Sequence, residues 1–136
     1  ILGWTSIQEN VDIIPLIFYF GAIFWTLGYD TIYGYQDIKD DEIIGVKSTS
    51  IKFKNNPKKL LCLCYSITIL SLILIGIFMK FNLIYFIGLI VVTYHLFIFQ
   101  IKKLNIKQPN VCLKIFKSNN LLGLLVFLNI LVGKII

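Results

Sequence analysis

The chain has 136 residues, of which 57% are hydrophobic and 15% charged, whereas a typical globular domain has about 45–50% and about 25%. This balance excludes an ordinary water-soluble domain and indicates one domain whose surface is covered by lipid. The net charge of +6 is not accompanied by basic residues interleaved with aromatic ones on a polar face, so we expect no nucleic-acid partner.

Four apolar stretches follow one another, each near the length of about 20 residues that a membrane-crossing helix needs. We expect spans at about 13–42, 58–79, 81–101 and 117–136, the first running as one helix through an acidic segment. Residues 1–12 are too few for a span and could be the exit of an earlier one. The sequence therefore predicts an all-α fold, a polytopic transmembrane helix bundle in a lipid bilayer.

The lysines lie mainly in two polar connectors between these spans. Six lie in 30–59 and five in 102–117, and four spans in series place both segments on one side of the membrane. The excess of positive charge predicts that this side is cytoplasmic. Within the connectors, Gly45 is expected to break the first helix, and Ser118 or Asn119 to cap the last one.

The segment GYDTIYGYQDIKDDEIIGVK holds five acids within thirteen positions, directly after an uncharged run. On one continuous helix Asp30, Tyr33, Asp37 and Asp41 would fall within about 60° of one another, with Asp40 beside them. Like charges at this spacing destabilise a helix, and the negative end of the helix dipole adds to the cost. A cation would offset both effects, and carboxylate oxygens suit Mg²⁺ that is shared with phosphate groups. The alternative is a plain solvated helix end, whereas the ligand spacing excludes an EF-hand.

Three further polar residues invite a functional interpretation. Lys47 and Ser48 follow the acids in IGVKST, and a lysine with a hydroxyl suits a diphosphate. Lys47 is explained equally well as an ordinary lysine on the cytoplasmic side. His95 lies within the third apolar stretch, where we expect a neutral imidazole that is hydrogen-bonded inside the bundle.

The string YDTIYGYQDIKDDEIIGVKSTSIKF closely resembles the second aspartate-rich motif of the UbiA-type membrane prenyltransferases, and most closely that of the 4-hydroxybenzoate polyprenyltransferase branch. IFKSNNLLGLLVFL is similar to the C-terminal region of that branch, so the resemblance covers essentially the whole chain. It implies a bundle of nine helices in which two aspartate motifs face each other across a cavity and hold Mg²⁺ ions. It also implies transfer of a polyprenyl group from its diphosphate to 4-hydroxybenzoate, a step in ubiquinone biosynthesis.

The resemblance assigns roles to individual residues of this chain. Asp37 and Asp41 become the catalytic pair and the metal ligands, and Tyr33 and Lys47 stand beside them as catalytic residues. The residues that bind the cofactor become Asp30, Asp40 and Ser48. Aromatic faces stabilise cations by about 0.5–2 kcal/mol, and the candidates for the allylic cation of the reaction are Trp25, Tyr29, Tyr33 and Tyr35.

The chain departs from the family in one respect, because no N-D-x-x-D string of the first aspartate motif occurs in it. We therefore expect the N-terminal half of the enzyme, with the partner carboxylates, to be missing, and this C-terminal part, 1–136, to be inactive alone. The alternatives are another branch of the superfamily, an inactive fragment, and a transporter segment, which would place acids in mid-span. The expected location is the bacterial inner membrane, or the mitochondrial inner membrane if eukaryotic, with the motif on the cytoplasmic or matrix side.

Overall fold

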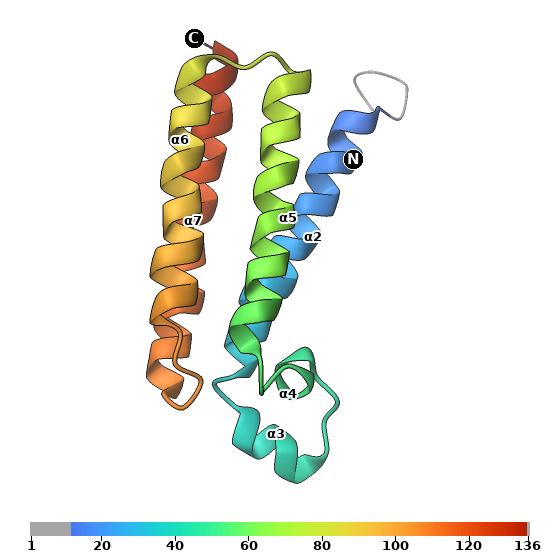
Figure 1. Cartoon of the computed structure of the whole chain (residues 1–136), viewed down its shortest axis with the longest axis vertical. Helices are drawn as coiled ribbons and strands as arrows, with labels where there is room; N and C mark the ends of the chain where they lie inside the picture. The colour runs from blue at the N-terminus through green and yellow to red at the C-terminus, as the bar shows by residue number, and fades with distance from the viewer. Residues whose placement is uncertain (1–11, 136) are drawn as a thin grey trace.

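The structure is a computed structural model that describes residues 12–135, and it is 83% helical (Figure 1). The expectation that residues 1–12 end an earlier span lies, except for Asp12, outside the described residues. The elements follow one another as α2 (Ile13–Gly34), α3 (Ile38–Ile44), α4 (Thr49–Lys52), α5 (Pro57–Phe78), α6 (Leu83–Tyr94), the π-helix η1 (His95–Lys102) and α7 (Pro109–Ile135).

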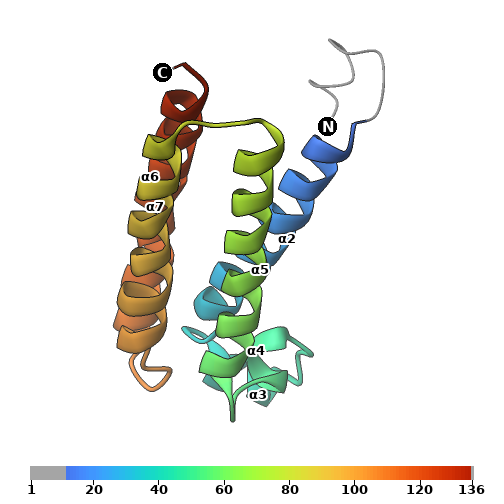
Figure 2. The same ribbon diagram turned by 45° about the horizontal axis from the view of Figure 1, so that its top comes forward.

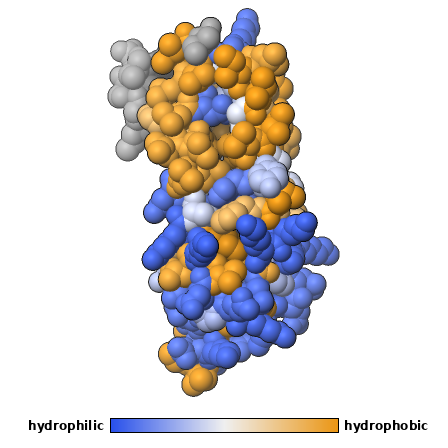
Figure 3. Space-filling view, turned by 90° about the vertical axis from the view of Figure 1, so that its left-hand side faces the viewer, coloured by the Kyte–Doolittle hydropathy of each residue, from blue (hydrophilic) through white to orange (hydrophobic). Residues whose placement is uncertain are grey.

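The long helices are arranged as two neighbouring pairs. Helix α2 lies beside α5, and α6 with η1 lies beside α7, as both ribbon views show (Figures 1 and 2). The short helices α3 and α4 and the loop between η1 and α7 lie at one end of the bundle. The turn between α5 and α6 and the C-terminus lie at the other end. The two lysine-rich connectors therefore share one end, and hydrophilic residues cover much of that half of the face in Figure 3.

Four helical segments in 12–135 are long and apolar enough to cross a membrane: α2, α5, α6 continued by η1, and α7. Helix α5 is the most buried of the four, while much of the surface of α2 and α7 is exposed and apolar. The prediction of an all-α membrane bundle is confirmed, and the chain is an integral membrane protein.

The contact between α2 and α5 depends on two residues that have no side chain. A Cβ at Gly28 would lie 2.5 Å from Cε1 of Tyr65, and one at Gly21 would lie 2.6 Å from Cβ of Ser71. The hydroxyl of Thr68 on α5 donates to the carbonyl oxygen of Gly21 at 3.2 Å. Small residues allow helix backbones in membranes to approach closely, and this pairing is of that kind.

The first helix ends at Gly34, so the expectation of one helix over 13–42 is wrong. The cause lies in α4, which folds back onto the end of α2. The side chain of Ser50 occupies the space that a Cβ of Gly34 would need, and its hydroxyl donates to the carbonyl oxygen of Thr31 at 2.9 Å. Tyr35 is fully buried beyond the helix end, and its hydroxyl donates to the carbonyl oxygen of Phe53 at 3.4 Å.

The last helix begins at Pro109, well before the expected residue 117. Proline is favoured at the first helical position because its missing N–H would have no partner there. Ser118 and Asn119 consequently lie inside α7 instead of capping it. The hydroxyl of Ser118 donates to the carbonyl oxygen of Ile115 at 2.6 Å, and the side chain of Asn119 is buried.

Candidate functional site

The aspartates lie around the turn that connects α2 with α3. Asp37 is the N-cap residue of α3, and its carbonyl oxygen accepts the backbone N–H groups of Asp40 and Asp41, each at 3.0 Å. Asp40 and Asp41 occupy the first turn of α3, where the helix dipole stabilises negative charge by about 0.3–1 kcal/mol. The expected dipole penalty is therefore wrong for these two residues, because the chain starts a new helix at them.

The proposed stripe of acids is divided between two helices. Asp30 and Tyr33 lie near the end of α2 with exposed side chains, whereas Asp37 and Asp41 lie beyond the turn. Across 12–135, no three His, Cys, Asp or Glu side chains form a group that could hold a metal ion. Asp37 and Asp41 lie four residues apart around the start of α3, and their assignment as a ligand pair stays a prediction.

The remaining acid of the cluster has a basic partner. Glu42 accepts two hydrogen bonds from the ammonium group of Lys54, at 2.7 and 3.0 Å, and both side chains are partly exposed. Gly45, in the left-handed region at φ 80°, ends a helix as expected, but this helix is α3 and not the first one. The crowding of acids is thus relieved in three ways: by the helix break, by the dipole of α3 and by this ion pair.

The next predicted residues, Lys47 and Ser48, join α3 to α4. Lys47 is exposed beside the aspartates in the chain. Ser48 is the N-cap residue of α4, and its hydroxyl accepts the N–H of Ile51 at 3.3 Å. The structure therefore gives Ser48 a capping role, and the hydroxyl keeps the capacity to donate to a further acceptor.

Two residues that the sequence analysis missed, Thr49 and Ser50, attach this loop to α2. The hydroxyl groups of Thr49 and Thr31 lie 3.0 Å apart, and Ser50 bonds to the carbonyl of Thr31. Burial, and to a smaller degree the neighbouring Cys112, raises the pKa of Tyr35 to about 12, so its phenol stays neutral and donates its hydrogen bond. The string STS in the predicted motif was the available signal, because hydroxyl side chains satisfy the free carbonyls of helix ends.

Ser50→Ala is expected to lower the stability of the folded chain by about 1 kcal/mol, or a few degrees in Tm, because one buried hydrogen bond is lost. The measurement is thermal unfolding in lipid nanodiscs, followed by circular dichroism. Ser66→Ala, at an exposed position of α5, is the matched control and should leave Tm unchanged. Equal melting of the two variants would show that α4 does not hold the end of α2 in this way.

Three aromatic residues of α2 form a face that begins near the aspartates and lies against α7. The ring centroids of Tyr33 and Phe116 lie 4.8 Å apart, those of Tyr29 and Phe116 5.9 Å, and those of Trp25 and Tyr29 5.9 Å. A groove of about 310 Å³ between α2 and α7 is lined by this face and by the amides of Asn119 and Asn120. Aromatic and polar groups therefore occupy the surface next to the acidic turn.

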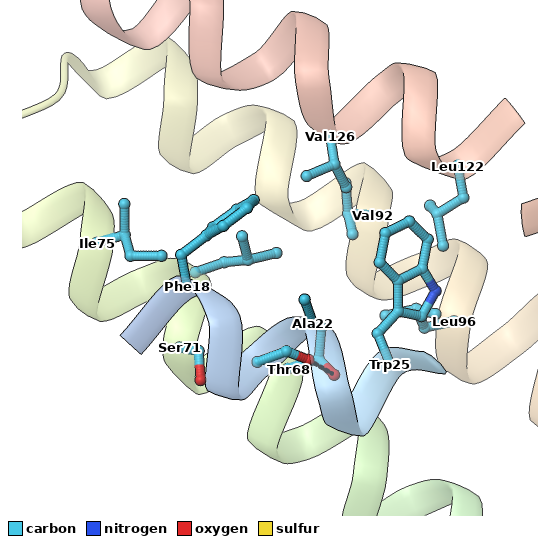
Figure 4. A pocket seen from close by; sticks show the side chains of 12 residues that line it. Phe18, Ala22, Trp25, Thr68, Ser71, Ile75, Val92, Leu96, Leu122 and Val126 are labelled. Atoms are coloured by element: carbon cyan, nitrogen blue, oxygen red, sulfur yellow. Dashed lines mark hydrogen bonds between the residues drawn. The ribbon is translucent and has the colours of Figure 1, made fainter. Parts of the chain in front are cut away.

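Beyond Trp25 lies an apolar cavity of about 160 Å³ that all the long helices enclose. Its lining is almost entirely hydrocarbon, and Figure 4 shows Phe18, Ala22 and Trp25 of α2 facing Val92, Leu96, Leu122 and Val126. The hydroxyl groups of Thr68 and Ser71 donate to backbone carbonyls and offer no charge to this space. The cavity suits a hydrocarbon chain.

The family of this chain is shown by its similarity to known proteins. The model of the "UbiA prenyltransferase family" matches residues 1–131. The chain belongs to the UbiA prenyltransferase family. Among curated relatives, the mitochondrial 4-hydroxybenzoate polyprenyltransferases of Homo sapiens and Bos taurus are 41% and 40% identical to this chain over 99% of its length. The corresponding protein of Dictyostelium discoideum is 38% identical over 98% of the chain.

This UbiA family chain spans about a third of the length of those relatives: 36% of the human and bovine proteins and 29% of the Dictyostelium protein. No solved structure matches the chain. Family membership confirms the resemblance drawn from the aspartate-rich string, whereas the roles of individual residues stay predictions.

The UbiA family is generally metal-dependent, so the donor set can be compared with what Mg²⁺ requires. Mg²⁺ is usually held by one or two carboxylates, together with water and substrate phosphate oxygens. Asp37 and Asp41 provide two carboxylates at the start of α3, at the end of the bundle that carries the lysine-rich connectors. The residues of this chain therefore fit a Mg²⁺ ion that shares its remaining positions with a diphosphate, and they do not form a closed site.

Proposed function

We propose that this chain contributes to Mg²⁺-dependent transfer of a polyprenyl group from polyprenyl diphosphate to 4-hydroxybenzoate, as in ubiquinone biosynthesis. One observation carries the proposal: an acidic turn, an aromatic face and an apolar cavity follow one another along α2. A polyprenyl diphosphate has the same order of chemistry, with an anionic head, an allylic carbon and a hydrocarbon tail. The names of the relatives supply the acceptor.

In this proposal the diphosphate is held at the acidic turn. Mg²⁺, bound there through Asp37 and Asp41, would neutralise the leaving diphosphate as a Lewis acid. Lys47 donates to diphosphate oxygens from the adjacent loop, and Asp30, Asp40 and Ser48 complete the polar surroundings. The carbon–oxygen bond to the diphosphate breaks, a carbon–carbon bond to the aromatic ring forms, and the ring loses a proton.

The aromatic rings next to the turn face the carbon that becomes cationic. Tyr33 and Tyr29 both pack on Phe116, which keeps the two rings close together on this face of α2. Such rings stabilise a cation by about 0.5–2 kcal/mol each. Tyr35 is fully buried and bonded to the backbone, which makes it a packing residue and removes it from the candidates.

The rest of the site is assigned to a segment that the relatives have and this chain does not cover. That segment would bring the partner carboxylates and the groups that bind the aromatic acid. The lysine-rich end of the bundle supports placing the acidic turn on the cytoplasmic or matrix side of an inner membrane. Acids at helix ends argue against the transporter alternative, which needs them in mid-span.

The test is a chimera in which this chain replaces the matching segment of the bovine enzyme. In proteoliposomes with Mg²⁺, it is expected to prenylate 4-hydroxybenzoate, and removal of Mg²⁺ with EDTA should abolish the product until Mg²⁺ is restored. The unsubstituted bovine enzyme is the control for the assay. A chimera that is inserted and folded but makes no product would favour an inactive remnant, and a naphthoate accepted in place of 4-hydroxybenzoate would favour another branch.

A further inference from the structure

A buried network of hydrogen-bonded polar side chains extends across the bundle beside the apolar cavity. The hydroxyl of Tyr65 on α5 donates to Oε1 of Gln100 at 2.6 Å, and Nε2 of Gln100 donates to Oδ1 of Asn119 at 2.9 Å. The same oxygen of Asn119 accepts the indole N–H of Trp25 at 2.9 Å. Tyr65 and Gln100 are fully buried, and Asn119 is 7% exposed.

The π-helix η1 positions Gln100, which is the central residue of this hydrogen-bonded network. Residues five apart on an α-helix point about 140° away from each other, whereas Nε2 of Gln100 lies 3.3 Å from Nδ1 of His95. The wider turn of η1 brings both side chains to one face, and π-turns of this kind often occur at functional sites. His95 is thus hydrogen-bonded within the bundle and supports Gln100 from the side opposite Tyr65.

The hydrogen-bonded network ends at the indole ring of Trp25, which lies between the apolar cavity and the polar groove. Trp25 and Ala22 line both the apolar cavity and the polar groove between α2 and α7, so the indole lies where the two spaces meet. In Figure 4 its nitrogen lies on the side turned away from Phe18 and the centre of the cavity. Because the N–H is bound to Asn119, the ring presents only carbon atoms to the cavity.

We propose that Trp25 contacts the polyprenyl chain beyond its first isoprenoid unit, and that Tyr65, Gln100 and Asn119 are positioning residues that hold its ring there. This inference rests on the proposed function. Trp25 precedes the end of α2 at Gly34 by nine residues, about 14 Å along the helix, and the diphosphate is placed beyond that end. The allylic carbon is placed at the rings of Tyr33 and Tyr29, and Trp25 lies one further helical turn toward the cavity, so the units that follow the first one pass the indole on their way in.

The first experiment measures the ring without any substrate. In the Trp4→Phe background Trp25 is the remaining tryptophan, and its fluorescence anisotropy in nanodiscs reports how firmly the indole is held. Gln100→Leu should lower the anisotropy, and Tyr65→Phe, which keeps the packed ring, should lower it to a smaller extent. Thr93→Val, which removes a hydrogen bond within α6 to the carbonyl of Leu89, is the matched control and should leave it unchanged.

The second experiment compares substrates of different length in the bovine chimera. Gln100→Leu and Trp25→Leu are each expected to lower kcat/KM for farnesyl diphosphate about tenfold relative to dimethylallyl diphosphate, the size of one lost apolar contact. The double variant should be no worse than Trp25→Leu, because Gln100 acts through Trp25. Thr93→Val should leave the ratio of the two substrates unchanged.

The outcomes separate this inference from the function on which it rests. An equal loss with both diphosphates in Trp25→Leu would overturn the proposed contact while the chimera remains a prenyltransferase, and an unchanged ratio in Gln100→Leu would overturn the positioning role. Unchanged anisotropy in Gln100→Leu would overturn the positioning role by itself. A chimera inactive with both diphosphates would remove the proposed function, and the contact with it.

Discussion

Asp37→Asn and Asp41→Asn, each introduced into the bovine chimera, should lower prenyl transfer by at least about 10²-fold. Each substitution removes a negative charge from the pair that would hold Mg²⁺, and a metal acting as a Lewis acid contributes several kcal/mol to such a step. Loss of about 3 kcal/mol corresponds to a factor of about 10² in rate. The measurement is product formation at saturating farnesyl diphosphate, over a range of Mg²⁺ concentrations.

The control for these variants is Asp12→Asn, at the opposite end of α2. The Asp12 side chain accepts the N–H of Ile13, and asparagine serves this N-cap position about as well as aspartate. This variant should retain full activity, which separates the removal of charge at the acidic turn from removal elsewhere. Normal turnover in both Asp37→Asn and Asp41→Asn would show that the metal pair has been assigned to the wrong residues.

Gly28→Leu should prevent α2 from packing on α5 and cost about 3 kcal/mol or more. Leucine is a good helix former, so the loss reflects packing and not helix propensity. A Cβ at this position already lies 2.5 Å from the ring of Tyr65, which cannot move aside because it is buried and its hydroxyl is bound to Gln100. Overpacking of a tight contact typically costs about 1–3 kcal/mol, and leucine adds further atoms.

The measurement is the thermal unfolding of the chain in nanodiscs, with an alanine pair as the matched comparison. Gly28→Ala should lower Tm, whereas Gly123→Ala on α7 should not, because its Cβ would meet Cη2 of Trp25 at an ordinary 3.4 Å. Equal melting of the two alanine variants would contradict the close approach of α2 and α5 at Gly28.

The membrane bundle could be predicted from the sequence because its signal is long-range and redundant. Each span needs many consecutive apolar residues, and α5 and the combined α6 and η1 lie close to the predicted ranges. The break after Gly34 could not be predicted in this way. It depends on tertiary contacts of Ser50 on α4 with the end of α2 and of Tyr35 with Phe53. The helical periodicity of the acids, in contrast, continued through the turn.

The sequence predicted some residues of the candidate site and missed others that the structure brings together. A specific string of residues pointed to the family, which the family match confirms, whereas the roles of Asp37 and Asp41 stay predictions. Asn119 was taken for a helix cap, because nothing in the local sequence shows that α7 begins at Pro109. Gln100 was overlooked because its importance arises from a π-turn and from partners on two other helices.

Tyr65 belongs to two structures at once, and this has an evolutionary consequence. Its ring fills the space left by Gly28, and its hydroxyl anchors Gln100. A side chain added at position 28 would therefore disturb the ring of Trp25 through Tyr65 and Gln100, although Trp25 lies on the same helix as Gly28. Residues coupled in this way do not drift independently, so we expect positions 28, 65 and 100 to covary among homologues and their double variants to deviate from additivity.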